Sequence, residues 1–126
     1  MVLIIGGASQ GKLQYVLTKT GDVSVAEDFS DAGNCRVFNR FHLAVRGLLT
    51  NGGDPESALD EIMRQNPGII IICDEIGGGV VPADPEGRAW REAVGRLCFK
   101  IAERADFVER VFCGLPMRLK GEGEWK

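Results

Sequence analysis

A glycine-rich stretch near the start of the chain has the residue types and spacing of a phosphate-binding loop. GGASQGK fulfils the pattern Gly-x4-Gly-Lys, directly after an apolar run at residues 2–5. In such a loop, backbone N–H groups and the first turn of the next helix bind phosphate oxygens, and the lysine reaches the outer phosphates. The alternative is a glycine-rich turn with a solvated lysine. We expect Lys12 to take part in catalysis, within a nucleotide-binding loop of Gly6, Gly7, Ala8, Ser9, Gln10, Gly11, Lys12 and Leu13.

The residue after the lysine departs from the pattern. A serine or threonine usually stands there, and its hydroxyl ligates magnesium, but this chain has Leu13. A leucine neither donates nor accepts a hydrogen bond, so water or another side chain has to replace that ligand. Phosphate binding by backbone amides is compatible with this change, whereas phosphoryl transfer is put in doubt.

Two carboxylates and one histidine are the other candidates for chemistry. Asp74 and Glu75 follow an unbroken apolar run, and either could act in catalysis, by holding Mg²⁺ or by orienting a nucleophile. The alternative is a solvated pair of acids at a strand end. His42 is the only histidine, and its apolar neighbours favour a structural role over a catalytic one.

Strands are expected to alternate with helices, which indicates an α/β fold with a mostly parallel sheet. Asp54 and Asp84, each followed by proline, are typical helix N-caps. Since ligands of such sheets bind at the carboxyl ends of the strands, the glycine loop and Asp74 are expected at one edge. Strands are expected at residues 2–5, 23–26, 36–38, 69–73 and 107–113, helices at 12–18, 40–49, 55–65 and 85–105, and loops at 27–34 and 74–82.

Composition narrows the class of protein. A length of 126 residues predicts a single domain, residues 1–126, which the glycine loop makes a nucleotide-binding domain. The polar tail is expected to be frayed from about residue 119. The net charge of −3, without a basic block, argues against binding nucleic acid. No apolar run is long enough to span a membrane, and no secretory signal is visible. Four cysteines without a C-x-x-C pair are typical of a reduced cytoplasmic protein.

Several motifs follow one another in the second half of the chain. They are DEIGGGVVP at residues 74–82, R-x-x-R-x-x-x-G-R at 88–96, A-x-x-A-D-x-V at 102–108 and G-L-P-x-x-x-K at 114–120. Together with GGASQGKL at 6–13, this order and spacing resembles the adenosylcobinamide kinase / adenosylcobinamide-phosphate guanylyltransferase family of cobalamin biosynthesis. The resemblance covers the first 20 residues and about residues 69–120.

The resemblance implies a fold and a reaction. The fold would be a P-loop NTPase-like, three-layer α/β structure. GTP or ATP, with Mg²⁺, would phosphorylate the aminopropanol hydroxyl of a corrinoid substrate, adenosylcobinamide. A second family reaction transfers GMP through a covalent guanylyl-histidine. Family members form homo-oligomers, so a homo-oligomer is expected.

This chain departs from the family in its middle part. The family's enzymes are longer there and carry the guanylylated histidine on an extra helix. FNRFHLAVRGLL, residues 38–49, best matches a later family segment, which places Asn39 at an aspartate and His42 at a threonine. In another alignment His42 falls on the nucleophilic histidine.

Three hypotheses follow. The first is a transferase in which the kinase step is favoured over guanylyl transfer. The second is a catalytically degenerate homologue that binds nucleotide or corrinoid as a sensor or partner subunit. The third is a structural α/β domain whose loop binds nothing.

Overall fold

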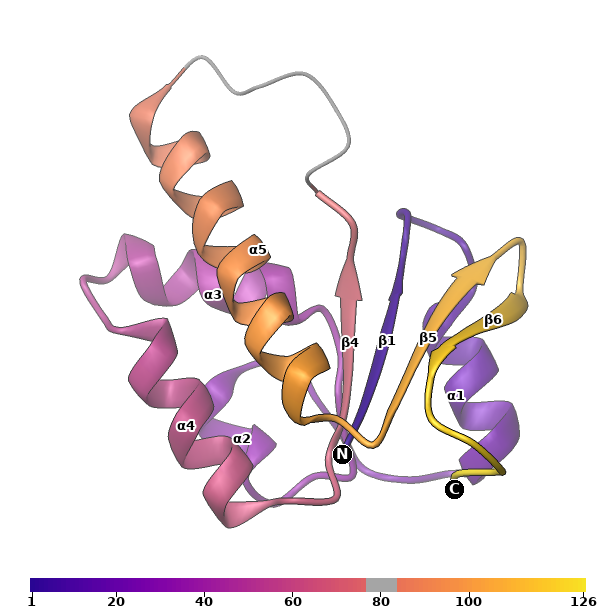
Figure 1. Ribbon diagram of the computed structural model, residues 1–126. Coiled ribbons are helices and arrows are strands. Elements are labelled where there is room, and N and C mark those ends of the chain that lie inside the picture. Colours follow the sequence, from indigo (N-terminus) through magenta and orange to yellow (C-terminus); the bar gives the residue numbers. More distant parts are fainter. Residues whose placement is uncertain (77–83) are drawn as a thin grey trace.

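The computed structural model describes residues 1–76 and 84–126 and shows one six-stranded sheet covered by helices (Figure 1). The strand order is β2-β3-β4-β1-β5-β6, in which β6 alone runs antiparallel to its neighbour. The strands are β1 Val2–Gly6, β2 Val25–Ala26, β3 Val37–Phe38, β4 Ile70–Asp74, β5 Phe107–Phe112 and β6 Leu115–Lys120. The helices are α1 Lys12–Thr20, α2 Phe29–Ala32, α3 Phe41–Thr50, α4 Pro55–Gln65 and α5 Pro85–Arg104.

The central strands are buried on both faces, as their unbroken apolar runs predict. β1 lies between β4 and β5, and its register places Gly6 opposite Asp74. Alternate residues of β4 point to opposite faces, so Ile71 joins one apolar cluster and Ile72 joins the other. The glycine loop and the end of β4 therefore meet at the same edge of the sheet.

Helices cover both faces, which gives three layers. Helices α2 to α5 supply Ala32, Phe41, Leu59 and Leu97 to the larger apolar cluster. Helix α1 supplies Val16 to the smaller cluster on the opposite face. Figure 1 shows α1 on the other side of the sheet from α3 and α5. The α/β class with a mostly parallel sheet is confirmed. Within the described residues no helix is both long and apolar enough to cross a membrane.

Hydrogen bonds confirm the two helix starts that were predicted where a proline follows an aspartate. The Asp54 carboxylate accepts from the Glu56 N–H at 3.1 Å, and the Asp84 carboxylate accepts from the Gly87 N–H at 2.8 Å. Each satisfies a backbone donor that the helix itself leaves without a partner. These caps fix the beginnings of α4 and α5, and α5 then packs Leu97 into the larger apolar cluster.

Two expectations for irregular segments were wrong. The expected loop at residues 27–34 contains the short helix α2, because the Asp28 carboxylate caps it by accepting from the Asp31 N–H. The expected frayed tail instead contributes to β6 as far as Lys120, and further on Trp125 is only 4% exposed. The glycine-rich part of the loop expected at residues 74–82 lies mostly outside the described residues.

The tail is fastened to α1 and β5 by a buried polar group. Glu109 is 3% exposed and accepts hydrogen bonds from the Tyr15 hydroxyl and from Arg118 Nε, the latter at 2.7 Å. The Tyr15 ring meets the Trp125 ring edge-on, with centroids 6.1 Å apart. Burial alone would raise the pKa of Glu109, but these hydrogen bonds outweigh it and hold the pKa below its usual value. The carboxylate therefore stays ionised and links three elements.

Candidate functional site

The glycine loop connects the end of β1 to the start of α1. Ser9 and Gly11 have positive φ angles of 59° and 85°, a conformation that Gly11 adopts at little cost. Gly11 stands at the N-cap of α1, and no side chain accepts from the first turn of this helix. Its backbone N–H groups thus keep the donors that anions bind at a helix start.

Lys12 lies buried between this loop and the end of β4. Its side chain is 6% exposed, and its Nζ donates to the Gly7 carbonyl at 2.6 Å. The same Nζ lies 2.7 Å from Asp74 Oδ1, and the Asp74 side chain is 25% exposed. An ammonium has three N–H donors, so one remains beyond these two contacts. Lys12 is therefore held at the loop with one N–H donor that neither of these two contacts uses.

Asp74 also contacts His42. Asp74 Oδ2 lies 3.3 Å from His42 Nε2, and the Asp74 backbone N–H donates to His42 Nδ1 at 3.1 Å. Since Nδ1 accepts, the proton of the neutral ring belongs on Nε2, where it faces the carboxylate. Burial is the main cause that lowers the pKa of His42. The negative charge of Asp74 raises this pKa, whereas the positive charges of Lys12 and Arg40 lower it further. His42 is therefore neutral in the folded protein near pH 7.

The structure brings three predicted site residues together as a chain of contacts, Lys12 to Asp74 to His42. The sequence left the role of His42 open, because its partner is distant along the chain. Helix α3 carries His42 at its first turn, and the Trp90 indole N–H of α5 donates to the His42 carbonyl at 2.7 Å. Helix α5 thus helps to position the ring that contacts Asp74.

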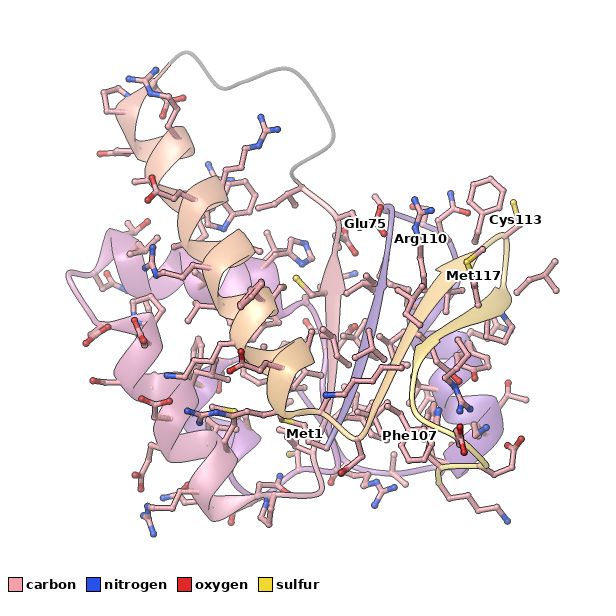
Figure 2. All side chains as sticks on the ribbon, in the orientation of Figure 1. Met1, Glu75, Phe107, Arg110, Cys113 and Met117 are labelled. Carbon is pink, nitrogen blue, oxygen red and sulfur yellow. The ribbon has the colours of Figure 1, made fainter. Side chains whose placement is uncertain are left out.

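Glu75 is directed to a different partner. Both of its carboxylate oxygens accept from Arg110, at 2.7 Å from Nε and 3.0 Å from Nη2. Figure 2 shows the two side chains next to each other at the upper ends of β4 and β5. Arg110 was not predicted from the sequence. The signal for it was the charged pair Glu109-Arg110 inside an otherwise apolar strand, where a charge needs a partner.

The remaining predicted residues lie in or around the glycine loop, apart from Asn39. Leu13 packs against the apolar cluster on the α1 face. The Gln10 side chain accepts from the Cys113 N–H at 2.7 Å, and so joins the loop to the turn between β5 and β6. Asn39 is 7% exposed and donates to Glu27 Oε2 at 3.0 Å. Gly6 and Gly7 begin the loop, and Ala8 lies exposed at its tip.

The donor set can be compared with the needs of Mg²⁺, which usually takes one or two carboxylates together with water and substrate phosphates. Asp74 offers one partly exposed carboxylate beside the loop, whereas Arg110 engages both oxygens of Glu75. In the described part of the chain no three histidine, cysteine or acidic side chains form a metal-binding group. These residues fit a metal held mostly by phosphate and water, with Asp74 as the protein ligand.

Two comparisons with known proteins identify the family of this chain. The family model described as cobinamide kinase / cobinamide phosphate guanyltransferase matches residues 52–119, more than half of the chain. A Pseudomonas aeruginosa protein named bifunctional adenosylcobalamin biosynthesis protein CobP is 37% identical over 100 residues, covering 74% of this chain and 57% of that protein. The chain thus spans less than two thirds of that relative's length. It belongs to the cobinamide kinase / cobinamide phosphate guanyltransferase family, which confirms the resemblance seen in its motifs.

Proposed function

We propose that this chain binds the triphosphate of GTP or ATP in the loop of residues 6–13 and transfers the terminal phosphoryl group to a corrinoid hydroxyl. The observation that carries this proposal is the buried Lys12, fixed between the Gly7 carbonyl and Asp74 at the carboxyl end of the central strands. Family membership supports the corrinoid acceptor, adenosylcobinamide, and the use of a nucleotide.

Each residue of the contact chain has a role in this reaction. Transfer breaks the bond between the terminal phosphorus and its bridging oxygen and releases GDP or ADP, while a bond to the acceptor oxygen forms and Asp74 takes the hydroxyl proton. Lys12 balances the negative charge of the phosphoryl group. A carboxylate has about four acceptor positions, and Asp74 uses two of them on Lys12 and His42, so it can also accept from the hydroxyl. Bound Mg²⁺ would supply further neutralisation of phosphate charge.

The position of His42 favours the kinase step over guanylyl transfer. A guanylylated histidine needs a ring nitrogen free to attack phosphorus. Both His42 nitrogens face Asp74, and the side chain is 7% exposed. His42 is therefore suited to hold Asp74 rather than to act as a nucleophile.

Labelled nucleotides separate the two reactions. The protein is incubated with adenosylcobinamide, Mg²⁺ and GTP labelled at either the α- or the γ-phosphate. The kinase reaction places γ-label on the corrinoid, whereas guanylyl transfer places α-label on protein or product. Lys12→Met should abolish the γ-label. Lys100→Met, which removes a lysine of α5 that pairs with Asp60 of α4, should retain it. Absence of γ-label in the unaltered protein would contradict the kinase assignment.

A second function, nucleotide binding without turnover, is favoured by Leu13. Its side chain packs into the apolar cluster and gives no hydroxyl to a metal. This form would act as a sensor or as a partner subunit. A thermal shift with GTP or ATP in the absence of any transferred label is the result that would support it.

We also propose a cytoplasmic homo-oligomer. The four free cysteines suit a reducing compartment. The hairpin of β5 and β6 exposes Phe112 at 62%, Leu115 at 70% and Met117 at 57%, a cluster of apolar side chains typical of an interaction surface. Figure 2 shows Met117 on this hairpin. In sedimentation experiments Leu115→Lys should shift the protein toward monomer, and an unchanged mass would exclude this hairpin as the interface.

A further inference from the structure

Two cysteine thiols meet between the sheet and the long helix. Cys73 lies on β4, Cys98 lies on α5, and their Sγ atoms are 3.6 Å apart. Figure 1 shows α5 slanting toward β4, with its N-terminal end away from the strand. Cys73 is 1% exposed, whereas Cys98 is half-buried and lines a pocket of about 330 Å³ together with Asp74 and Glu75.

We propose that Cys73 and Cys98 form a redox-active pair, which a peroxide converts into an intramolecular disulfide beside the candidate active site. The pocket gives a small oxidant access to Cys98 first, because Cys73 is covered by the core. The buried partner then lies in van der Waals contact with the oxidised sulfur. The proposal concerns the thiols alone and holds whether or not the chain transfers phosphate.

The chemistry needs one equivalent of peroxide. Hydrogen peroxide oxidises the Cys98 thiol to a sulfenic acid and releases one water. The Cys73 sulfur attacks the Cys98 sulfur, the S–OH bond breaks, and a second water leaves with the Cys73 proton. Two thiols are thereby oxidised and one peroxide is reduced. A thiol such as dithiothreitol reverses the step by thiol–disulfide exchange.

The position one turn before Cys98 on α5 is open. Gly95 stands there, and apart from its chain neighbours and the nearby backbone of α5 no heavy atom lies within 4 Å of where its Cβ would be. Rotation of the Cys98 side chain therefore meets no crowding from that position. The bond would join α5 to the residue just before Asp74, so it would restrain the end of β4 and the pocket next to it.

The test uses a Cys35→Ser/Cys113→Ser protein, in which only the proposed pair remains. Hydrogen peroxide should remove both thiols together, with a mass lower by about 2 Da. Dithiothreitol should restore both thiols, and peptide mapping should show Cys73 joined to Cys98. The matched control adds Cys98→Ala, and its buried Cys73 should keep its thiol under the same treatment.

Two results would overturn the proposal. One is survival of both thiols at peroxide concentrations that oxidise free glutathione. The other is a mass gain of about 32 Da with Cys73 still reduced, which means that Cys98 passes to the sulfinic acid without meeting its partner. Peptide mapping of the unaltered protein after peroxide treatment should also show Cys73 joined to Cys98, which makes the test independent of the serine substitutions.

Discussion

Replacing either member of the Lys12–Asp74 pair should lower stability, yet the two replacements should change nucleotide affinity in opposite directions. Lys12→Met keeps the length of the side chain but removes its charge, and so leaves Asp74 with His42 alone and the Gly7 carbonyl without this donor. Asp74→Asn keeps the ammonium at the loop and removes the carboxylate charge that opposes an approaching phosphate.

The burial of the pair sets the size of the stability effect. Breaking a fully buried ion pair costs about 3–5 kcal/mol. The Asp74 side chain is 25% exposed and retains His42, so we expect about 2 kcal/mol for Lys12→Met. For a chain of this length that free energy lowers the melting temperature by about 8 °C. Asp74→Asn leaves a lysine that is 6% exposed without its counter-charge, and we expect a similar loss of about 2 kcal/mol.

Nucleotide affinity distinguishes a phosphate-binding lysine from a structural one. A hydrogen bond from a charged donor contributes about 1.5–3 kcal/mol, so Lys12→Met should weaken GTP binding by about 10- to 150-fold. In the absence of Mg²⁺, where Asp74 ligates no metal, Asp74→Asn should bind GTP more tightly than the unaltered protein. Urea unfolding measures stability and calorimetric titration with GTP in the presence of EDTA measures affinity, with Lys100→Met as the control. Equal weakening by both variants would refute the reasoning, because affinity would then follow stability alone.

Three further predictions concern single residues. Because burial lowers the pKa of His42, the unfolded chain binds the extra proton more readily than the folded protein, so the free energy of unfolding should fall as pH drops below about 6.5. His42→Gln should flatten this part of a stability–pH curve. An unchanged slope would exclude His42 as its source. Glu109→Gln should lower the free energy of unfolding by about 3 kcal/mol in urea titrations, because Arg118 and Tyr15 lose a buried carboxylate. A change below about 0.5 kcal/mol would show that the hydrogen bonds to Glu109 contribute little to stability. Leu13→Ser should strengthen Mg²⁺-dependent GTP binding in calorimetry by restoring a hydroxyl, and equal affinity with and without the metal would contradict that role for position 13.

Local sequence determined the central elements, though not α2 or β6, and the edge at which they meet. The apolar run before Asp74 predicted a buried strand, and proline after Asp54 or Asp84 marked the helix starts because each carboxylate caps its own helix. The glycine spacing around Lys12 predicted a strand-to-loop-to-helix unit for the same reason, since those conformations depend on neighbours along the chain. The order of motifs from Asp74 onward identified the family.

Only the tertiary structure decided which side chains meet. Lys12, His42 and Asp74 come from three separate elements, and no local pattern states that His42 supports the carboxylate rather than facing solvent. The Arg110 partner of Glu75 depends on the order of β4, β1 and β5 in the sheet. The polar tail is held because Trp125 packs against α1, a long-range burial that composition alone does not reveal. Contacts between distant segments depend on how the layers pack, so their residues cannot be paired from spacing along the chain.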